Sequence, residues 1–551
     1  MVPRRQRTGV VVGLGAGTAT FQRALAAQAQ NSTSNSITPE MIQQAEWVAG
    51  ITLTDEERKR LAATLQRQFG NINKLRSEPI DNSIAPALVF HPAGSLTGTR
   101  ELCSISMTLP NSVERPSHET DLAFASLVQL SHLIRYRKMS SRELTELYLT
   151  RLKKYDPQLL CVTSLTEEVA RRQAAQADAE FARGIYRGPL HGIPWGAKDL
   201  IAYPGYNTTW GAEPYKNQKL EAKATVARKL EEAGAVLVAK LTLGALAMGD
   251  VWYGGMTRNP WNLKQGSSGS SAGSASATAA GLVGFAIGSE TLGSIVSPST
   301  RCGVTGLRPT FGRVSRAGCM ALAWSMDKIG PIARTVEDCA YIFAAIQGID
   351  SQDASTVDRG FLWPSRKPVQ NMQVGYVESQ MKKMEDREEL KLLQGMGVKL
   401  KPVKLPLQKA TAIVNTILTA EAGACFDQLM RQGVKQGIGT WPATFQEAQF
   451  ISAVDYLRAN RLRTELMREM EEIMADLDAI VAGGDLVLTN LTGHPQVVMP
   501  FGFSTFSDGI RSPRAITFTG KLYGESELLT LCHHFQCQTD YHLQRPLLDK
   551  T

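Results

Sequence analysis

The spacing of apolar residues predicts helices along much of the chain. Residues 140–157, SSRELTELYLTRLKKYDP, open with a Ser-x-x-Glu capping box. Four apolar residues then fall on one helical face: Leu144, Leu147, Tyr148 and Leu152. This pattern indicates a scaffold helix that buries one side.

Segments with helical and strand patterns alternate in the residues that follow. EEVARRQAAQADAEFARG at 167–184 is helical, and ATVARKLEEAGAVLVAKL at 224–241 pairs a helix with an apolar strand. Residues 476–503 indicate two buried strands around a turn. Such alternation is typical of an α/β domain, with helices on the faces of a layered sheet. We therefore predict one large α/β domain over residues 117–546.

A helical accessory segment is expected ahead of this domain, over residues 30–116. TPEMIQQAEWVAG at 38–50 and TLTDEERKRLAATLQRQF at 52–69 both begin with threonine and continue with helical apolar spacing. Residues 76–95 are rich in proline and polar residues, which predicts a linker.

The first 29 residues have the pattern of an export signal. They combine Arg4 and Arg5, an apolar stretch over 10–21, and small residues that end at Ala29. The twin arginines favour the twin-arginine route, and the stretch is too short and glycine-rich for a membrane span. We expect a bacterial protein that is exported to the periplasm or beyond; the alternative is a disordered basic tail on a cytoplasmic protein.

Composition indicates a globular protein and favours neither nucleic-acid binding nor a zinc site. The chain has 551 residues, of which 43% are apolar and 20% charged, which is ordinary for a globular protein. The formal net charge is +8, but the sequence has no stripe of basic residues interleaved with aromatic residues. We therefore do not predict nucleic-acid binding. The eight cysteines form no CxxC pair, so we expect free thiols and no zinc site.

Serine and glycine are concentrated in residues 266–294, GSSGSSAGSASATAAGLVGFAIGSETLGS. A flexible linker would be flanked by polar residues, whereas this stretch continues into small apolar residues that suit burial. Buried hydroxyls need hydrogen-bond partners. The residues by themselves leave a flexible loop and a functional loop equally open.

Two longer segments decide between a flexible loop and a functional loop. They are GIPWGAKDL at 192–200 and, at 259–335, NPWNLKQGSSGSSAGSASATAAGLVGFAIGSETLGSIVSPSTRCGVTGLRPTFGRVSRAGCMALAWSMDKIGPIART. They resemble the amidase signature family, and the resemblance extends through most of 117–546. It implies a central mixed sheet flanked by helices, and a small-molecule amide as substrate. It implies neither a metal nor an organic cofactor.

The resemblance also implies the catalytic residues. The family's lysine falls on Lys198 and its nucleophile on Ser294, and the family's spacing back from Ser294 selects Ser270 as the bridging serine. The resemblance further implies a cis peptide bond between Gly269 and Ser270. Four backbone amides would form the oxyanion hole: Thr291, Leu292, Gly293 and Ser294.

The chemistry explains why these residue types belong together. A serine hydroxyl is a weak nucleophile until a base removes its proton. Lys198 must be neutral to do so, although a free lysine has a pKa of about 10.4. Burial among hydroxyls would disfavour its ammonium form, and Ser270 would relay the proton from Ser294.

The chain departs from the family pattern at three positions. Ala272 and Leu292 each stand where the family usually has glycine, and Val296 stands where it commonly has arginine. Leu292 keeps its amide but would narrow the acyl side of the pocket. The loss of the arginine makes a small anionic acyl group a less suitable substrate.

Three functions follow from the sequence. We favour a free-standing amidase, whose geometry would also suit esters or carbamates. The alternatives are the glutaminase subunit of a tRNA-dependent amidotransferase and a catalytically silent binding scaffold. We expect His191 and His494 to be structural, and Asp199 to form a structural ion pair.

Overall fold

The computed structural model describes residues 36–78, 88, 103–108, 113–377, 387–481, 486–505 and 511–548. The predicted export signal at residues 1–29 lies outside the described residues. The chain divides into two units. The helical unit takes residues up to 86 with 412–435 and 440–462, and the sheet unit takes 87–411, 436–439 and 463–551.

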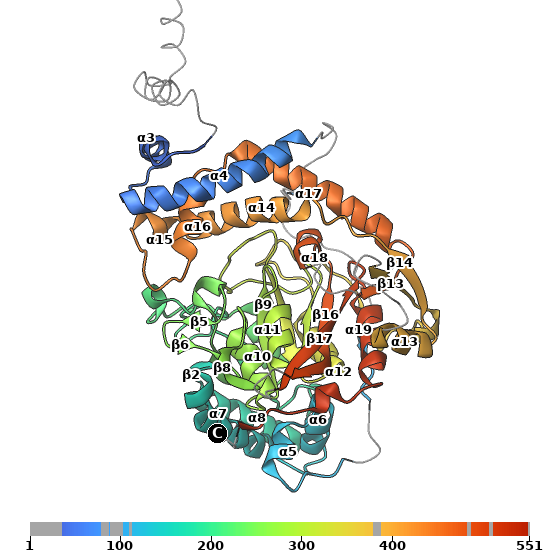
Figure 1. Cartoon of the computed structure of the whole chain (residues 1–551). Coiled ribbons are helices and arrows are strands. Elements are labelled where there is room, and N and C mark those ends of the chain that lie inside the picture. The colour runs from blue at the N-terminus through green and yellow to red at the C-terminus, as the bar shows by residue number, and fades with distance from the viewer. Residues whose placement is uncertain are drawn as a thin grey trace, which may run out of the picture. The chain divides into compact units, whose positions relative to one another are not determined.

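An eleven-stranded mixed sheet forms the centre of the sheet unit (Figure 1). Its strands lie in the following spatial order: β14 (Lys399–Val403), β13 (Gln373–Val377), β15 (Ala479–Val481), β17 (Arg511–Gly520), β16 (Gln496–Thr505), β10 (Thr305–Arg308), β11 (Lys328–Ala333), β9 (Phe285–Glu290), β3 (Pro194–Lys198), β4 (Val236–Leu241) and β2 (Val162–Leu165). Strand β3 runs parallel to β4 and β9, whereas β11 runs antiparallel to β9. The predicted α/β class with a central mixed sheet is thereby confirmed.

Helices lie against this sheet. Helix α10 contacts β3, β4 and β9, and α11 contacts β10, β16 and β17. The sheet unit includes the helices α5 (Glu119–Ala123), α6 (Leu127–Arg135), α7 (Ser141–Leu159), α8 (Glu167–Ala182), α9 (Thr225–Glu232), α10 (Ala272–Ala279), α11 (Val296–Cys302), α12 (Val336–Ile346), α13 (Glu388–Gly395), α18 (Leu486–Thr492) and α19 (Glu525–Gln536). Short strands pair outside the sheet: β1 (Cys103–Ile105) with β12 (Phe361–Trp363), β5 (Val251–Trp252) with β6 (Gly255–Met256), and β7 (Arg258–Asn259) with β8 (Asn262–Gly266).

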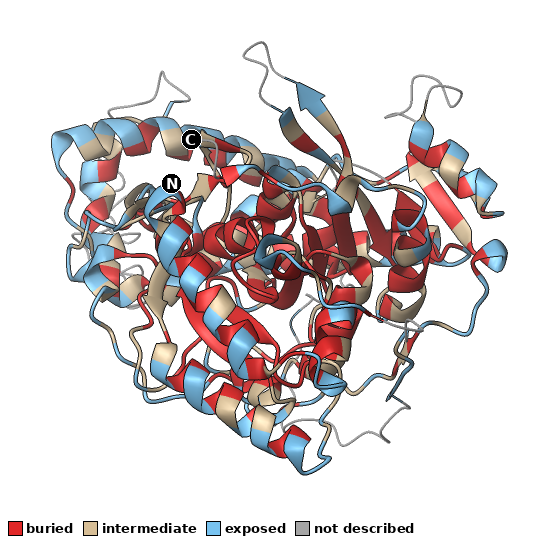
Figure 2. Ribbon diagram, turned by 90° about the horizontal axis from the view of Figure 1, so that it is seen from below, coloured by how far each residue is buried: buried red, intermediate tan, exposed pale blue. Residues whose placement is uncertain are grey.

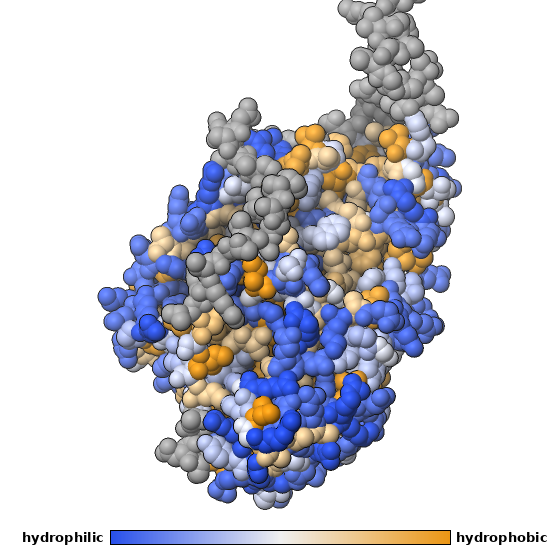
Figure 3. All heavy atoms as spheres, turned by 180° about the vertical axis from the view of Figure 1, so that it is seen from behind, coloured by the Kyte–Doolittle hydropathy of each residue, from blue (hydrophilic) through white to orange (hydrophobic). Residues whose placement is uncertain are grey.

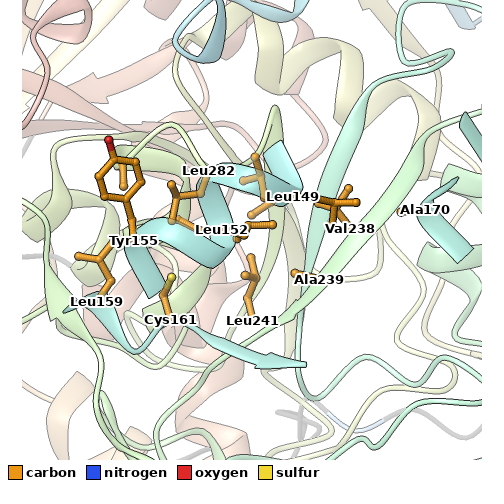
Figure 4. Close-up of a cluster of buried hydrophobic side chains, with 14 of the residues drawn as sticks. Leu149, Leu152, Tyr155, Leu159, Cys161, Ala170, Val238, Ala239, Leu241 and Leu282 are labelled. Carbon is orange, nitrogen blue, oxygen red and sulfur yellow. The ribbon is translucent and has the colours of Figure 1, made fainter. Parts of the chain in front are cut away.

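Helix α7 follows the sequence pattern closely. The Ser140 side chain accepts from the Glu143 amide at 3.1 Å, and the Glu143 carboxylate accepts from the Ser140 amide at 2.7 Å, so the capping box is present. The buried face of α7 joins a hydrophobic cluster with strand β4 (Figure 4). Leu149, Leu152 and Leu159 are at most 1% exposed. Burial of each such leucine stabilises the fold by about 1.5–3 kcal/mol.

The prediction of two strands around a turn over residues 476–503 is wrong in its connection. Strands β15 and β16 are present, but helix α18 lies between them in the chain and β17 separates them in the sheet. Leu488 and Leu491 are both fully buried, and their spacing of three residues suits a helix.

The helical unit contains the two predicted helices, α3 (Pro39–Ala49) and α4 (Asp55–Ser77), and the side chains of Thr38 and Thr54 cap them. It also contains α15 (Asp427–Arg431), α16 (Trp441–Ala448), most of α14 (Ala410–Cys425) and the first part of α17 (Ala453–Met474). The apolar faces of α3 and α4 pack around Ile42, Leu61 and Leu65, with Phe450 against them. This unit therefore includes segments from within the range 117–546.

Burial follows the same layers. Figure 2 shows buried residues gathered on the strands of the sheet and on the helices against them. The face drawn in Figure 3 carries mainly hydrophilic residues, with apolar residues in small separate groups. Within the described ranges, no helix has the length and apolarity to cross a membrane.

Candidate active site

Lys198 is the last residue of β3 and is fully buried. Its Nζ lies 2.8 Å from Ser270 Oγ, 2.9 Å from Ser289 Oγ and 3.1 Å from Ser271 Oγ. The Ser289 carbonyl oxygen is 3.3 Å away. The predicted lysine and bridging serine are thus in direct contact, inside a ring of hydroxyls.

Burial lowers the pKa of Lys198 to about 7, while the carboxylates of Asp327 and Glu290 act in the opposite direction. A neutral amine is therefore accessible near neutral pH, and its lone pair can accept a proton. The Ser271 hydroxyl donates to the Ser289 carbonyl at 3.0 Å, so its proton is already engaged. For the Ser270 hydroxyl proton, the described residues offer no acceptor besides Lys198, so Ser270 is suited to donate to a neutral lysine.

The loop between β8 and α10 holds Ser270, which is 1% exposed. The peptide bond between Gly269 and Ser270 is cis, as the family resemblance implied. A Cβ on Gly269 would lie 1.9 Å from the carbonyl oxygen of Gly249, so only glycine fits there. The Ser268 amide donates to the Asp250 carboxylate at 2.8 Å, which ties this loop to the residues before β5.

Ser294 lies in the turn between β9 and α11 and is half-buried. The Ser271 amide donates to the Ser294 carbonyl oxygen at 3.0 Å. The turn and the serine loop therefore lie side by side, and the residue after Ser270 bonds directly to the predicted nucleophile. All three predicted catalytic residues come together where β3, β9 and the serine loop meet.

The turn at Ser294 presents its backbone amides. Gly293 has φ +85°, a left-handed conformation that favours glycine. Among the described residues, no acceptor binds the four predicted oxyanion-hole amides, which are those of Thr291, Leu292, Gly293 and Ser294. These amides are therefore available to a substrate oxygen.

Glu290 holds both ends of this turn. Its Oε2 accepts from the amides of Ile295 at 2.8 Å and Val296 at 3.0 Å. Its Oε1 accepts from Arg308 and Asn490, each at 2.8 Å. Contact with Arg308 and these hydrogen bonds outweigh burial and lower the pKa of Glu290 to about 2, so the carboxylate is charged.

Four residues of this site are not predicted by the sequence. The sequence assigns no role to Ser271, and it does not single out Ser289, Glu290 or Asp327. The Thr291 hydroxyl donates to Asp327 Oδ1 at 2.6 Å. The available signal was position: Ser289 and Glu290 directly precede the predicted oxyanion-hole residues.

Other polar residues have structural partners. Lys240 lies 2.7 Å from Asp199, and both are fully buried, so Asp199 forms the expected structural ion pair. His191 pairs with Glu180 at 3.1 Å, and Thr492 binds His494 at 2.8 Å. Across the described ranges there is no cluster of side chains that could hold a metal ion.

Comparison with known proteins identifies the family of the chain. A sequence profile of the family described as Amidase matches residues 143–483, more than half of the chain. A glutamyl-tRNA(Gln) amidotransferase subunit of Acinetobacter baumannii is 33% identical over 495 residues, covering 77% of this chain and 98% of that protein. The corresponding protein of Geobacillus stearothermophilus is 32% identical over 485 residues, covering 77% and 99%.

Solved structures are similar as well. The peptide amidase of Stenotrophomonas maltophilia has 28% identity and a TM-score of 0.68, covering 77% of this chain and 99% of that one. The glutamyl-tRNA(Gln) amidotransferase subunit of Thermotoga maritima has 29% identity and a TM-score of 0.63, covering 78% and 99%. With the mixed sheet and the lysine–serine cluster in place, these matches establish that the chain belongs to the amidase signature family.

Proposed function

We propose that this amidase-family hydrolase cleaves a carboxamide through an acyl-enzyme on Ser294, with Lys198 as general base and Ser270 as relay. The observation that carries the proposal is the 2.8 Å contact between the buried Lys198 amine and the Ser270 hydroxyl, next to the turn that holds Ser294. In the proposed relay the proton would pass from the Ser294 hydroxyl to the Ser270 hydroxyl and from there to the neutral amine of Lys198.

The proposed reaction has two stages. Ser294 Oγ attacks the amide carbon while its proton moves to Ser270, whose own proton moves to Lys198. The C–N bond then breaks, and the departing amine takes back the proton through Ser270. In the second stage Lys198 and Ser270 activate a water molecule, which hydrolyses the ester on Ser294 and releases the carboxylic acid.

The amides of residues 291–294 would stabilise the negative charge on the carbonyl oxygen. Removal of one such donor typically slows acyl transfer about 100-fold or more. Because the same attack and charge development occur with esters and carbamates, we include these as further substrate classes.

A second candidate is the glutaminase subunit of a tRNA-dependent amidotransferase. Its support is the 33% identity to a protein with that name over 98% of that protein's length. Val296 argues against it, because a glutamine substrate carries a carboxylate that the family's usual arginine at this position would suit. Turnover of simple aryl amides by the isolated chain would favour the free-standing amidase.

The third candidate is a silent binding scaffold, which needs no buried lysine. Burial of an amine without a carboxylate partner costs free energy, and Lys198 contacts only serine oxygens among its hydrogen-bond partners. Retention of such a lysine is expected of a catalyst.

Labelling with a fluorophosphonate tests the proposal. Intact mass should show one adduct, and peptide mapping should place it on Ser294. Ser294→Ala and Lys198→Ala should abolish labelling. Ser267→Ala is the matched control from the same serine run and should label normally. Within the part of the chain that the structure describes, the Ser267 hydroxyl bonds only to the neighbouring Ser268 carbonyl. An adduct on another residue, or none on the folded chain, would refute the acyl-enzyme.

We further propose that the chain is exported with residues 1–29 as its signal. Expressed in a bacterium, it should appear outside the cytoplasm with a new N-terminus at Gln30. Replacement of Arg4 and Arg5 by lysine should retain it in the cytoplasm if the twin-arginine route is used. An unprocessed chain confined to the cytoplasm would favour the alternative of a basic tail.

A further inference from the structure

Asp327 joins two segments that border the site. Its Oδ1 accepts from the Thr291 hydroxyl at 2.6 Å, at the first of the predicted oxyanion-hole residues. Its Oδ2 accepts from the amides of Leu322 at 2.8 Å and Ala323 at 3.0 Å. A single buried carboxylate therefore fastens the turn that carries Ser294 to the loop before β11.

The sheet places this carboxylate near the general base. Asp327 directly precedes β11, Thr291 directly follows β9, and Lys198 ends β3, and these three strands are consecutive in the sheet. The loop before β11 is tied to β3 as well, because the Met320 amide donates to the Leu200 carbonyl at 3.1 Å. The negative charge of Asp327 acts on Lys198 and favours its ammonium form.

The neighbours of Asp327 favour its charged form at the site. All three of its hydrogen bonds are donated to its oxygens, which suits a carboxylate. Arg316 is the cation that acts on this carboxylate, whereas burial lowers the pKa of the neighbouring Lys328 well below its usual range. Burial raises the pKa of Asp327, and the hydrogen bonds and Arg316 oppose that effect.

The charged groups around Lys198 are few. Glu290 on β9 and Asp327 before β11 are the carboxylates that act on it. Arg308 already pairs with Glu290, and on the other side of β3 Lys240 pairs with Asp199. Asp327 differs from Glu290 in this respect. Among the described residues, no lysine or arginine side chain forms a salt bridge with Asp327.

We propose that Asp327 is a positioning residue for acyl transfer: it fixes the amide-bearing turn through Thr291 and supplies the negative charge that faces Lys198. The inference rests on the proposed function, because it assigns Asp327 to the base and the oxyanion hole of that reaction. The geometric role depends on the Thr291 hydroxyl and the electrostatic role on the charge of Asp327, so separate variants can test them.

Asp327→Asn tests the charge. The asparagine oxygen can accept from the Leu322 and Ala323 amides, and its NH₂ group can donate to Thr291, so the hydrogen bonds survive while the charge is lost. Loss of the negative charge makes the ammonium form of Lys198 less favourable. The acid limb of the pH profile for fluorophosphonate labelling of Ser294 should therefore move to lower pH by on the order of one unit.

Asp350→Asn is the matched control for this variant. Asp350 has the same exposure as Asp327, 8%, and likewise accepts from side-chain hydroxyls, those of Thr225 and Ser315. It is not among the groups that act on Lys198. Its acid limb should stay at the wild-type pH, and a shift as large as that of Asp327→Asn would overturn the electrostatic role.

Thr291→Val tests the geometry. It removes the hydroxyl but keeps the Asp327 charge, so labelling at pH 8 should slow by about 10- to 100-fold without displacement of the acid limb. Thr291→Ser retains the hydroxyl and should restore most of the rate. A Thr291→Val variant that labels at the wild-type rate would overturn the positioning role.

The outcomes separate the two levels of inference. Wild-type chain that labels on Ser294, together with an unmoved acid limb in folded Asp327→Asn, refutes the electrostatic role of Asp327 and leaves the proposed function intact. Wild-type chain that does not label refutes both. If Asp327→Asn fails to fold, the Thr291 pair still decides the positioning role.

Discussion

Lys198→Met should change the number of protons that the chain binds on unfolding. In the unfolded chain Lys198 titrates at its ordinary pKa of 10.5, whereas in the folded chain burial lowers the pKa to about 7. At pH 8.5 the unfolded lysine is therefore almost fully protonated and the folded lysine almost fully neutral. The wild type should take up about one proton more on unfolding than Lys198→Met.

The same difference predicts how stability depends on pH. The folded pKa is the lower one, so burial of the ammonium destabilises the fold fully below pH 7, and the penalty is relieved as pH rises towards 10.5. The two pKa values differ by about 3.5, which corresponds to about 5 kcal/mol at 1.36 kcal/mol per unit. Relative to Lys198→Met, the wild type should gain about 1.4 kcal/mol of stability per pH unit between pH 7 and 10.

Proton uptake can be measured directly when the protein is unfolded with urea at pH 8.5 in weakly buffered solution. Lys264→Met is the matched control, because it makes the same replacement at an exposed lysine. Circular dichroism should establish that both variants fold. Equal proton uptake by the wild type and Lys198→Met would mean that Lys198 stays an ammonium in the folded chain, and the general-base reasoning would fail.

Three further substitutions test the surroundings of the site. Gly269→Ala should slow labelling of Ser294 by about 100-fold, because a Cβ there would lie 1.9 Å from the Gly249 carbonyl oxygen and must displace the loop; normal labelling would contradict this contact. Leu292→Gly should raise kcat/KM for benzoyl relative to acetyl anilides by about tenfold, since it keeps the amide and removes bulk; an unchanged ratio would place Leu292 away from the acyl group. Asp199→Asn should destabilise the sheet unit by about 3–5 kcal/mol in chemical unfolding, because Lys240 would remain buried without its carboxylate; a loss below about 1 kcal/mol would contradict the structural ion pair.

The sequence by itself determined many of the local elements and selected the candidate residues of the site. Capping residues such as Ser140 and Thr54 act on the turn that follows them, so helix starts can be predicted from a few neighbouring positions. The serine-rich loop, with Lys198 ahead of it, carried a resemblance strong enough to indicate the family and to select Ser270 and Ser294. The structure places these residues together, and their catalytic roles remain the proposal that labelling tests.

Only the tertiary structure decided which distant residues complete the site. Ser289 joins Ser270 and Ser271 around Lys198 because β9 pairs with β3, and strand pairing between distant segments leaves little trace in one sequence. The helical unit likewise draws on residues 412–435 and 440–462, because the apolar faces of α3 and α4 need a partner that local patterns do not identify. Asp327 reaches Thr291 from 36 residues further along the chain. Such long-range contacts depend on how the sheet orders its strands, which local spacing does not encode.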